Sequence, residues 1–219
     1  MSFDQLLDVI YSPGRGDWTE RNKAALAALF GSGSGRYPQV AAGRVALRAP
    51  KMSPTRVVPF AAYIHPSNPT SGAYSGFSFV MFPSGDSACL IGLVLGTQGL
   101  APDEAILGRP GHARKVQAIC KWLNKEYGGG VRVAWAKQDP TRTDIDVPDE
   151  IKKVWAEHRP ALERYGKEVY ALFGPTTSRN ATEAALAAFL DLLFEERGYK
   201  PLSQWTTEHD CIRSSCFAH

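Results

Sequence analysis

The sequence predicts an α+β fold: a curved, mainly antiparallel sheet flanked by helices, followed by a helical C-terminal segment. Two apolar runs on either side of the turn-like stretch 83–86 predict a buried β-hairpin. Stretches with apolar residues at helical spacing occur both before and after this hairpin. From residue 151 onward, helical spacing dominates, which predicts the helical ending.

Helices are predicted first at 3–11 and 19–30, because each shows an apolar stripe and is followed by glycine. The Gly-rich segment 31–36 is expected to be a loop, since it lacks the Lys-Ser/Thr ending of a phosphate-binding loop. Strands are predicted at 39–50 and 55–64, and Pro59 inside the second one indicates a bulge or an edge.

The hairpin strands are predicted at 77–82 and 88–96, and the second is apolar on both faces, so both faces should be covered. A helix at 113–127 and a strand at 131–137 follow. Helices on both sides of Pro160 through residue 173, and at 180–198, complete the chain. These elements suggest an α/β domain over 1–140, a linker over 141–150 and a helical appendage over 151–219, which could pack on the first domain.

Charge is distributed unevenly along the chain, although the net charge is only +3. Residues 1–140 contain 15 basic and 9 acidic side chains, which leaves 10 basic and 13 acidic in the rest of the 25 and 22. Residues 31–60 contain basic side chains and no acidic one. This asymmetry favours a front part that binds a polyanion, with an Arg-rich solvated loop as the alternative.

Three short motifs follow one another in a recognisable order. They are Val58-Pro59-Phe60, Gly72-Ala73-Tyr74 with the aromatic strand after it, and Leu95-Gly96-Thr97-Gln98-Gly99. Over roughly residues 35–100, this order resembles the amino-terminal DNA-binding domain of McrB-type restriction proteins. Phe60 stands where that family has tryptophan, which changes the size of the slot and removes an N–H donor.

The resemblance implies a non-enzymatic reader of DNA, including methylated DNA, that flips a modified base into an aromatic pocket for a restriction or phage-defence system. Unstacking a base costs a few kcal/mol, and an aromatic slot offsets this cost by stacking. Phe60 and Tyr74 are expected nearest the base. The proposed base-pocket residues are Tyr37, Phe60, Tyr63, Tyr74 and Phe77, and the proposed DNA-backbone residues are Arg36, Arg44, Arg48, Lys51 and Arg56.

The same aromatic side chains could instead be ordinary core residues. The family joins its reader to a GTP-driven AAA+ motor, and no Gly-x-x-x-x-Gly-Lys-Ser/Thr motif occurs in this sequence. A motor is therefore expected in the same longer chain or in a separate subunit, with an associated nuclease. No cofactor is expected.

Other chemistry is less favoured. Four zinc-type ligands lie close together near residue 219, but their short spacing favours a plain tail; they are His209, Cys211, Cys216 and His219. A metal-dependent nuclease would use acidic and basic groups at 144–152, where a solvated acidic linker is the simpler interpretation. A protein-interaction module remains an alternative, if the 151–173 and 182–195 helices expose apolar faces.

A cytoplasmic location is expected. No run of eighteen apolar residues occurs, so no membrane span is predicted. The N-terminus lacks the basic-then-apolar order of a signal peptide. Cys89 and Cys120 lie in apolar surroundings and are interpreted as small core residues, which is consistent with a reducing compartment.

Overall fold

The computed structural model describes residues 3–31, 33–48, 58–85, 87–99, 110–195 and 197–202. The first half of the fold consists of α1 (Asp4–Tyr11), α2 (Trp18–Ala27), the 3-10 helix η1 (Gln39–Arg44), β1 (Ala46–Arg48), β2 (Ala61–Ile64), β3 (Phe77–Ser84) and β4 (Ser87–Leu95). The second half consists of α3 (Pro110–Tyr127), β5 (Ala134–Ala136), α4 (Asp149–Val154), the 3-10 helix η3 (Ala156–His158), α5 (Arg159–Tyr165), β6 (Val169–Phe173) and α6 (Arg179–Glu195).

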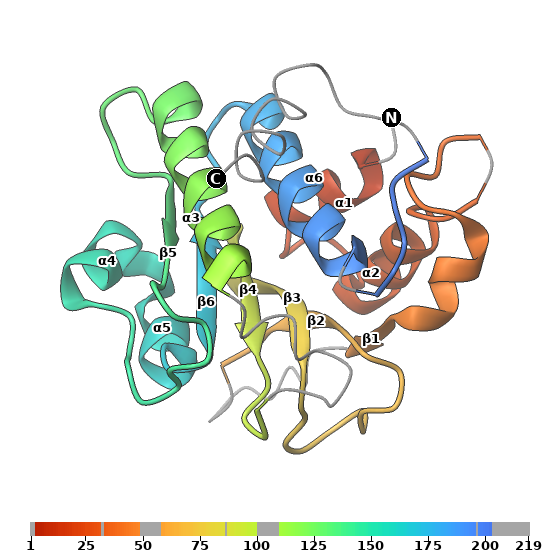
Figure 1. The fold of residues 1–219 in the computed structure, drawn as a ribbon. Helices are drawn as coiled ribbons and strands as arrows, with labels where there is room; N and C mark the ends of the chain where they lie inside the picture. The colour runs from red at the N-terminus through yellow and green to blue at the C-terminus, as the bar shows by residue number, and fades with distance from the viewer. Residues whose placement is uncertain are drawn as a thin grey trace.

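The strands form one six-stranded antiparallel sheet in the order β1-β2-β3-β4-β6-β5. Helices cover both of its faces (Figure 1). The apolar core on one face is shared with α1, α2, α3 and α6, and the core on the other is shared with α4 and α5. This arrangement confirms the predicted α+β class.

The β3–β4 hairpin forms the centre of the sheet, as predicted. Its register pairs Phe77 with Leu95 and Met81 with Ile91. Strand alternation sends Phe77 and Met81 to the α6 side and Phe82 to the α5 side. Both strands are apolar on both sides because each side packs against helices.

The helix predicted after Pro160 through residue 173 is wrong at its end. Residues Val169–Phe173 are a strand, and this strand lies inside the sheet between β4 and β5. All five of its residues are buried. A short, fully apolar run with β-branched and aromatic residues suits a strand covered on both faces. Its apolar residues also continue the helical spacing of the preceding segment, which is why the sequence pattern predicts a helix there. The described part of 151–202 therefore contributes one strand to the sheet formed by the preceding chain.

The strands predicted at 39–50 and 55–64 are shorter than expected. Residues Gln39–Arg44 form a 3-10 helix, Ala46–Arg48 form β1, and residues 49–57 lie outside the described residues. The next strand, β2, begins at Ala61, two residues after Pro59, which has no N–H to donate to a sheet ladder. Within the described residues, no helix is both long and apolar enough to span a bilayer.

Candidate functional site

A pocket of about 400 Å³ opens on the α5 side of the sheet, where residues of β1, β3 and β4 and the end of α5 line it. Its volume falls in the range of small-molecule sites, roughly 300–1,000 Å³. Six segments line it: Arg48 at the end of β1, Val58 and Phe60, the loop 70–74, Val80 and Phe82 on β3, Val94 and Leu95 on β4 with Thr97, and finally Arg164, Tyr165 and Glu168.

Aromatic rings form much of the pocket wall. Phe82 from β3 and Tyr165 from α5 stack with ring centroids 5.7 Å apart and an interplanar angle of 17°. Phe60 meets Tyr165 edge-to-face at 5.4 Å. A wall of this kind offers both flat π-faces and apolar edges to a planar ring that enters the pocket.

Arg48 is the central cation of the pocket. Its guanidinium lies over the ring of Tyr74 at 4.9 Å and over the ring of Phe60 at 5.7 Å. Its Nη2 donates a hydrogen bond to the carbonyl of Gly72. Its Nη1 is buried, and among the described residues it has no hydrogen-bond partner. A buried donor without an acceptor is costly, so a ligand that brings an oxygen acceptor to Nη1 would be stabilised there.

Tyr74 is placed in the wall by a close backbone approach. Gln98 donates its N–H to the Tyr74 carbonyl at 3.1 Å, and Gly96 donates to Gly76 at 2.9 Å. A Cβ at Gly96 would overlap the Tyr74 carbonyl, so this position requires glycine. The contact joins two of the motifs noted in the sequence, Gly72-Ala73-Tyr74 and Leu95-Gly96.

The Tyr74 hydroxyl lies 3.1 Å from the Ser78 hydroxyl. Burial raises the pKa of Tyr74, while Ser78 and Arg48 act in the opposite direction. The phenol therefore stays protonated at neutral pH and is held in a fixed orientation.

The loop that forms one side of the pocket is ordered by its own side chains. Asn68 donates from Nδ2 to the Ser75 carbonyl at 2.8 Å and accepts from the Ser75 N–H at 3.2 Å. Gly72 has a φ of +90°, a conformation that favours glycine, and its carbonyl receives the Arg48 bond. The pocket is thus largely formed without a ligand, which lowers the entropic cost of binding.

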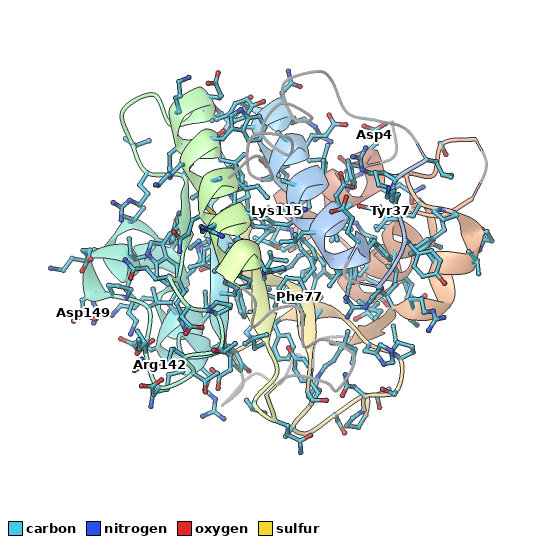
Figure 2. All side chains as sticks on the ribbon, in the orientation of Figure 1. Asp4, Tyr37, Phe77, Lys115, Arg142 and Asp149 are labelled. Atoms are coloured by element: carbon cyan, nitrogen blue, oxygen red, sulfur yellow. The ribbon has the colours of Figure 1, made fainter. Side chains whose placement is uncertain are left out.

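Three of the predicted site residues, Arg48, Phe60 and Tyr74, meet in this pocket. The other predicted pocket residues do not. Tyr37, Tyr63 and Phe77 are fully buried in the core on the α6 side of the sheet. Figure 2 shows Tyr37 and Phe77 on that side. These three are core residues, which agrees with the alternative that the aromatic side chains pack in the core.

Arg36 also requires correction, because it is buried and cannot reach a phosphate. Its Nε and Nη2 donate to the two carboxylate oxygens of Asp191 on α6 at 2.7 and 2.6 Å. The Tyr37 hydroxyl donates to the same carboxylate at 2.9 Å. The side chains of Arg36 and Asp191 are only 1% and 4% exposed.

The remaining predicted cations differ in their placement. Arg44 is exposed, and its Nε lies 3.3 Å from the Tyr199 hydroxyl. Lys51 and Arg56 lie outside the described residues, as do all four predicted zinc ligands, His209, Cys211, Cys216 and His219.

Sequence reasoning missed the pocket residues that follow residue 150, namely Arg164, Tyr165 and Glu168. They reach the pocket because β6 enters the sheet beside β4 and brings the end of α5 with it. The apolar run at 169–173 is the sequence signal that could have found them. If this run is recognised as a strand of the sheet, the turn before it is expected beside the hairpin.

Two acidic groups of the nuclease alternative, Asp144 and Asp146, are engaged with neighbouring cations. Asp144 accepts two hydrogen bonds from Arg142, which lower its pKa to about 2. Asp146 pairs with Lys152 at 2.8 Å. Across the described residues, no three His, Cys, Asp or Glu side chains lie together as a metal site would require.

The interaction-module alternative depended on exposed apolar helix faces. Helix α6 is instead buried along nearly its whole length. It lies over the sheet between α1 and α3 (Figure 1). The 182–195 face is therefore already occupied by the chain's own core.

No family model, curated protein or solved structure matches this chain. The functional argument thus depends on the geometry of the pocket and on the motif order in the sequence.

Proposed function

We propose that this chain is a DNA-binding module that receives an unstacked base, modified or unmodified, in the pocket formed by Arg48, Phe60, Tyr74 and Tyr165. In this proposal the chain is a non-catalytic, cytoplasmic reader in a restriction or phage-defence system. An AAA+ motor, in the same longer chain or a separate subunit, and a nuclease would act on what it reads.

One observation carries the proposal. Phe60 and Tyr74 belong to two separate motifs and Arg48 to the basic segment 31–60, and all three line one pocket of about 400 Å³. Stacking on aromatic side chains is worth about 1–3 kcal/mol per base, comparable with the few kcal/mol needed to unstack it. Arg48 adds a hydrogen-bond donor that lacks an acceptor among the described residues.

The test is a binding experiment on oligonucleotide duplexes. Fluorescence anisotropy would compare duplexes that carry cytosine, methylated cytosine, adenine or methylated adenine, and duplexes with a single mismatch. We expect binding that weakens with rising salt, because phosphate contacts release counterions. We also expect tighter binding to the mismatched duplex, since a poorly paired base costs less to extrude.

Variants separate the pocket from the rest of the surface. Tyr74→Ala and Phe60→Ala each remove a wall of the pocket and are expected to weaken binding by about five- to a hundredfold, which corresponds to the stacking energy of one base. Tyr127→Ala, on α3 at the other face of the sheet, removes an aromatic ring outside the pocket and should bind normally. If the unaltered protein shows no detectable DNA binding, or binding that does not depend on salt, the proposed function is refuted.

A further inference from the structure

We propose that the end of α5 and the turn that follows it supply the phosphate-binding cations of the pocket, through Arg164 on the helix and Lys167 in the turn. The nucleic acid backbone would cross the mouth of the pocket between this turn and Arg48. This inference rests on the proposed function and assigns a binding surface to a part of the chain that the sequence resemblance does not cover.

The turn is fixed in place by three hydrogen bonds. The Glu168 N–H donates to the Tyr165 carbonyl at 3.0 Å and closes the turn. The Leu95 N–H donates to the Glu168 carbonyl at 2.9 Å and joins the turn to β4. The buried Lys137 donates from Nζ to the Lys167 carbonyl at 2.7 Å.

Gly166 allows the turn to pack this closely. A Cβ at this position would overlap the Asp146 carboxylate and the Leu162 carbonyl. The backbone that carries Arg164 and Lys167 is therefore held before any ligand arrives. Preorganised cations lose less entropy on binding than cations on a free loop.

Both cations are available to an anion. Arg164 lines the pocket, and Lys167 lies one residue before Glu168, which also lines it. Both side chains are exposed, and among the described residues neither forms an ion pair. The adjacent acid on α5, Glu163, is already bonded to Arg159 at 2.7 Å.

The charge of the pocket lining favours an anionic partner. The lining contains two arginines, Arg48 and Arg164, against one acid, Glu168. Burial raises the pKa of Tyr165, and the neighbouring cations Arg164 and Arg48 act in the opposite direction. A base that stacked against the aromatic rings of the pocket wall would place its own phosphates near Arg164 and Lys167.

The neighbouring surface limits the path of the backbone. Helix α4 begins with Asp149 and Glu150, both exposed. Asp149 lies at the outer edge of the α4 side in Figure 2. The last turn of α4 carries Lys152 and Lys153, so only its first turn repels a polyanion, and the backbone should leave the pocket toward the β1 edge and not across that first turn.

The experiment measures the salt dependence of oligonucleotide binding by fluorescence anisotropy, from about 50 to 200 mM salt. The probe is a fluorescein-labelled duplex with one mismatched base pair. The test variant is Arg164→Ala with Lys167→Ala. Losing two phosphate contacts should reduce the slope of log K against log salt by about 1.4–1.8.

The same variant should weaken binding by a similar factor for every base tested, because phosphate contacts do not discriminate sequence. The matched control is Arg114→Ala with Lys121→Ala, which removes one exposed arginine and one exposed lysine from α3 on the other side of the sheet. Its slope should equal that of the unaltered protein.

Three results would overturn the inference. An unchanged slope for the Arg164/Lys167 variant, while Tyr74→Ala still weakens binding, would refute this surface and leave the proposed function standing. An equal loss of slope in the α3 control would show a general charge effect and would also refute it. Absence of binding by the unaltered protein would end both the inference and the proposed function.

Discussion

The clearest prediction concerns Arg36, which the sequence indicated as a DNA contact and the structure buries in a salt bridge. Replacing Arg36 with alanine removes both hydrogen bonds to Asp191 and leaves the carboxylate, 4% exposed, without its cation. We therefore expect a severe loss of stability and no specific loss of DNA affinity in the folded protein.

The size of the effect follows from the burial of the pair. Removing one partner of a buried ion pair costs about 3–5 kcal/mol, because the remaining charge is left uncompensated in a low-dielectric interior. The Tyr37 hydroxyl still donates to Asp191 at 2.9 Å, so a value toward the lower end is expected. Against a total stability of about 5–15 kcal/mol, this is a large fraction.

The assay is urea unfolding followed by tryptophan fluorescence at pH 7, with the free energy of unfolding taken by linear extrapolation. Arg44→Ala is the control: it removes an exposed arginine of the same basic segment and should change stability by no more than about 0.5 kcal/mol. The double variant Arg36→Met with Asp191→Leu should be more stable than either single variant, because it leaves no unpaired charge. If Arg36→Ala unfolds within about 1 kcal/mol of the unaltered protein yet binds DNA more weakly, the buried geometry is wrong.

Three further predictions test the pocket and the core. Gly96→Ala should destabilise the protein by about 1–3 kcal/mol and weaken oligonucleotide binding, because its Cβ overlaps the Tyr74 carbonyl; equal affinity would contradict the proposed role of this contact. The Leu90 N–H donates to Nε2 of His158, and burial lowers the pKa of His158 below the ordinary 6.5. Below this pH the unfolded chain binds more protons than the folded chain, so the free energy of unfolding should fall as the pH drops below about 6.5. His158→Gln should reduce the dependence of the unfolding free energy on pH, measured by urea titrations at several pH values. An unchanged dependence would contradict this role of His158. Burial raises the pKa of Cys120 to about 12, so its thiol should react with a disulfide reagent only after unfolding, as mapped by mass spectrometry.

The sequence by itself determined the elements whose information is local. The β3–β4 hairpin follows from alternation around a turn, and α3 follows from apolar residues at helical spacing, because both patterns reflect neighbours a few positions apart. The α+β class and the cover on both faces of β4 follow from the same patterns. The resemblance of the motif order also pointed to Phe60 and Tyr74, and both line the pocket.

Only the tertiary structure decided which side of the sheet each side chain faces and which distant groups meet. Strand alternation predicts that Phe77 and Phe82 lie on opposite faces of the sheet. It does not predict that α6 covers one face while a pocket remains open on the other. The burial of Arg36 depends on Asp191, 155 positions away. The pocket gains Tyr165 only because β6 enters the sheet beside β4. These outcomes arise from contacts between segments far apart in the chain, whose free energy exists only once the whole sheet has formed.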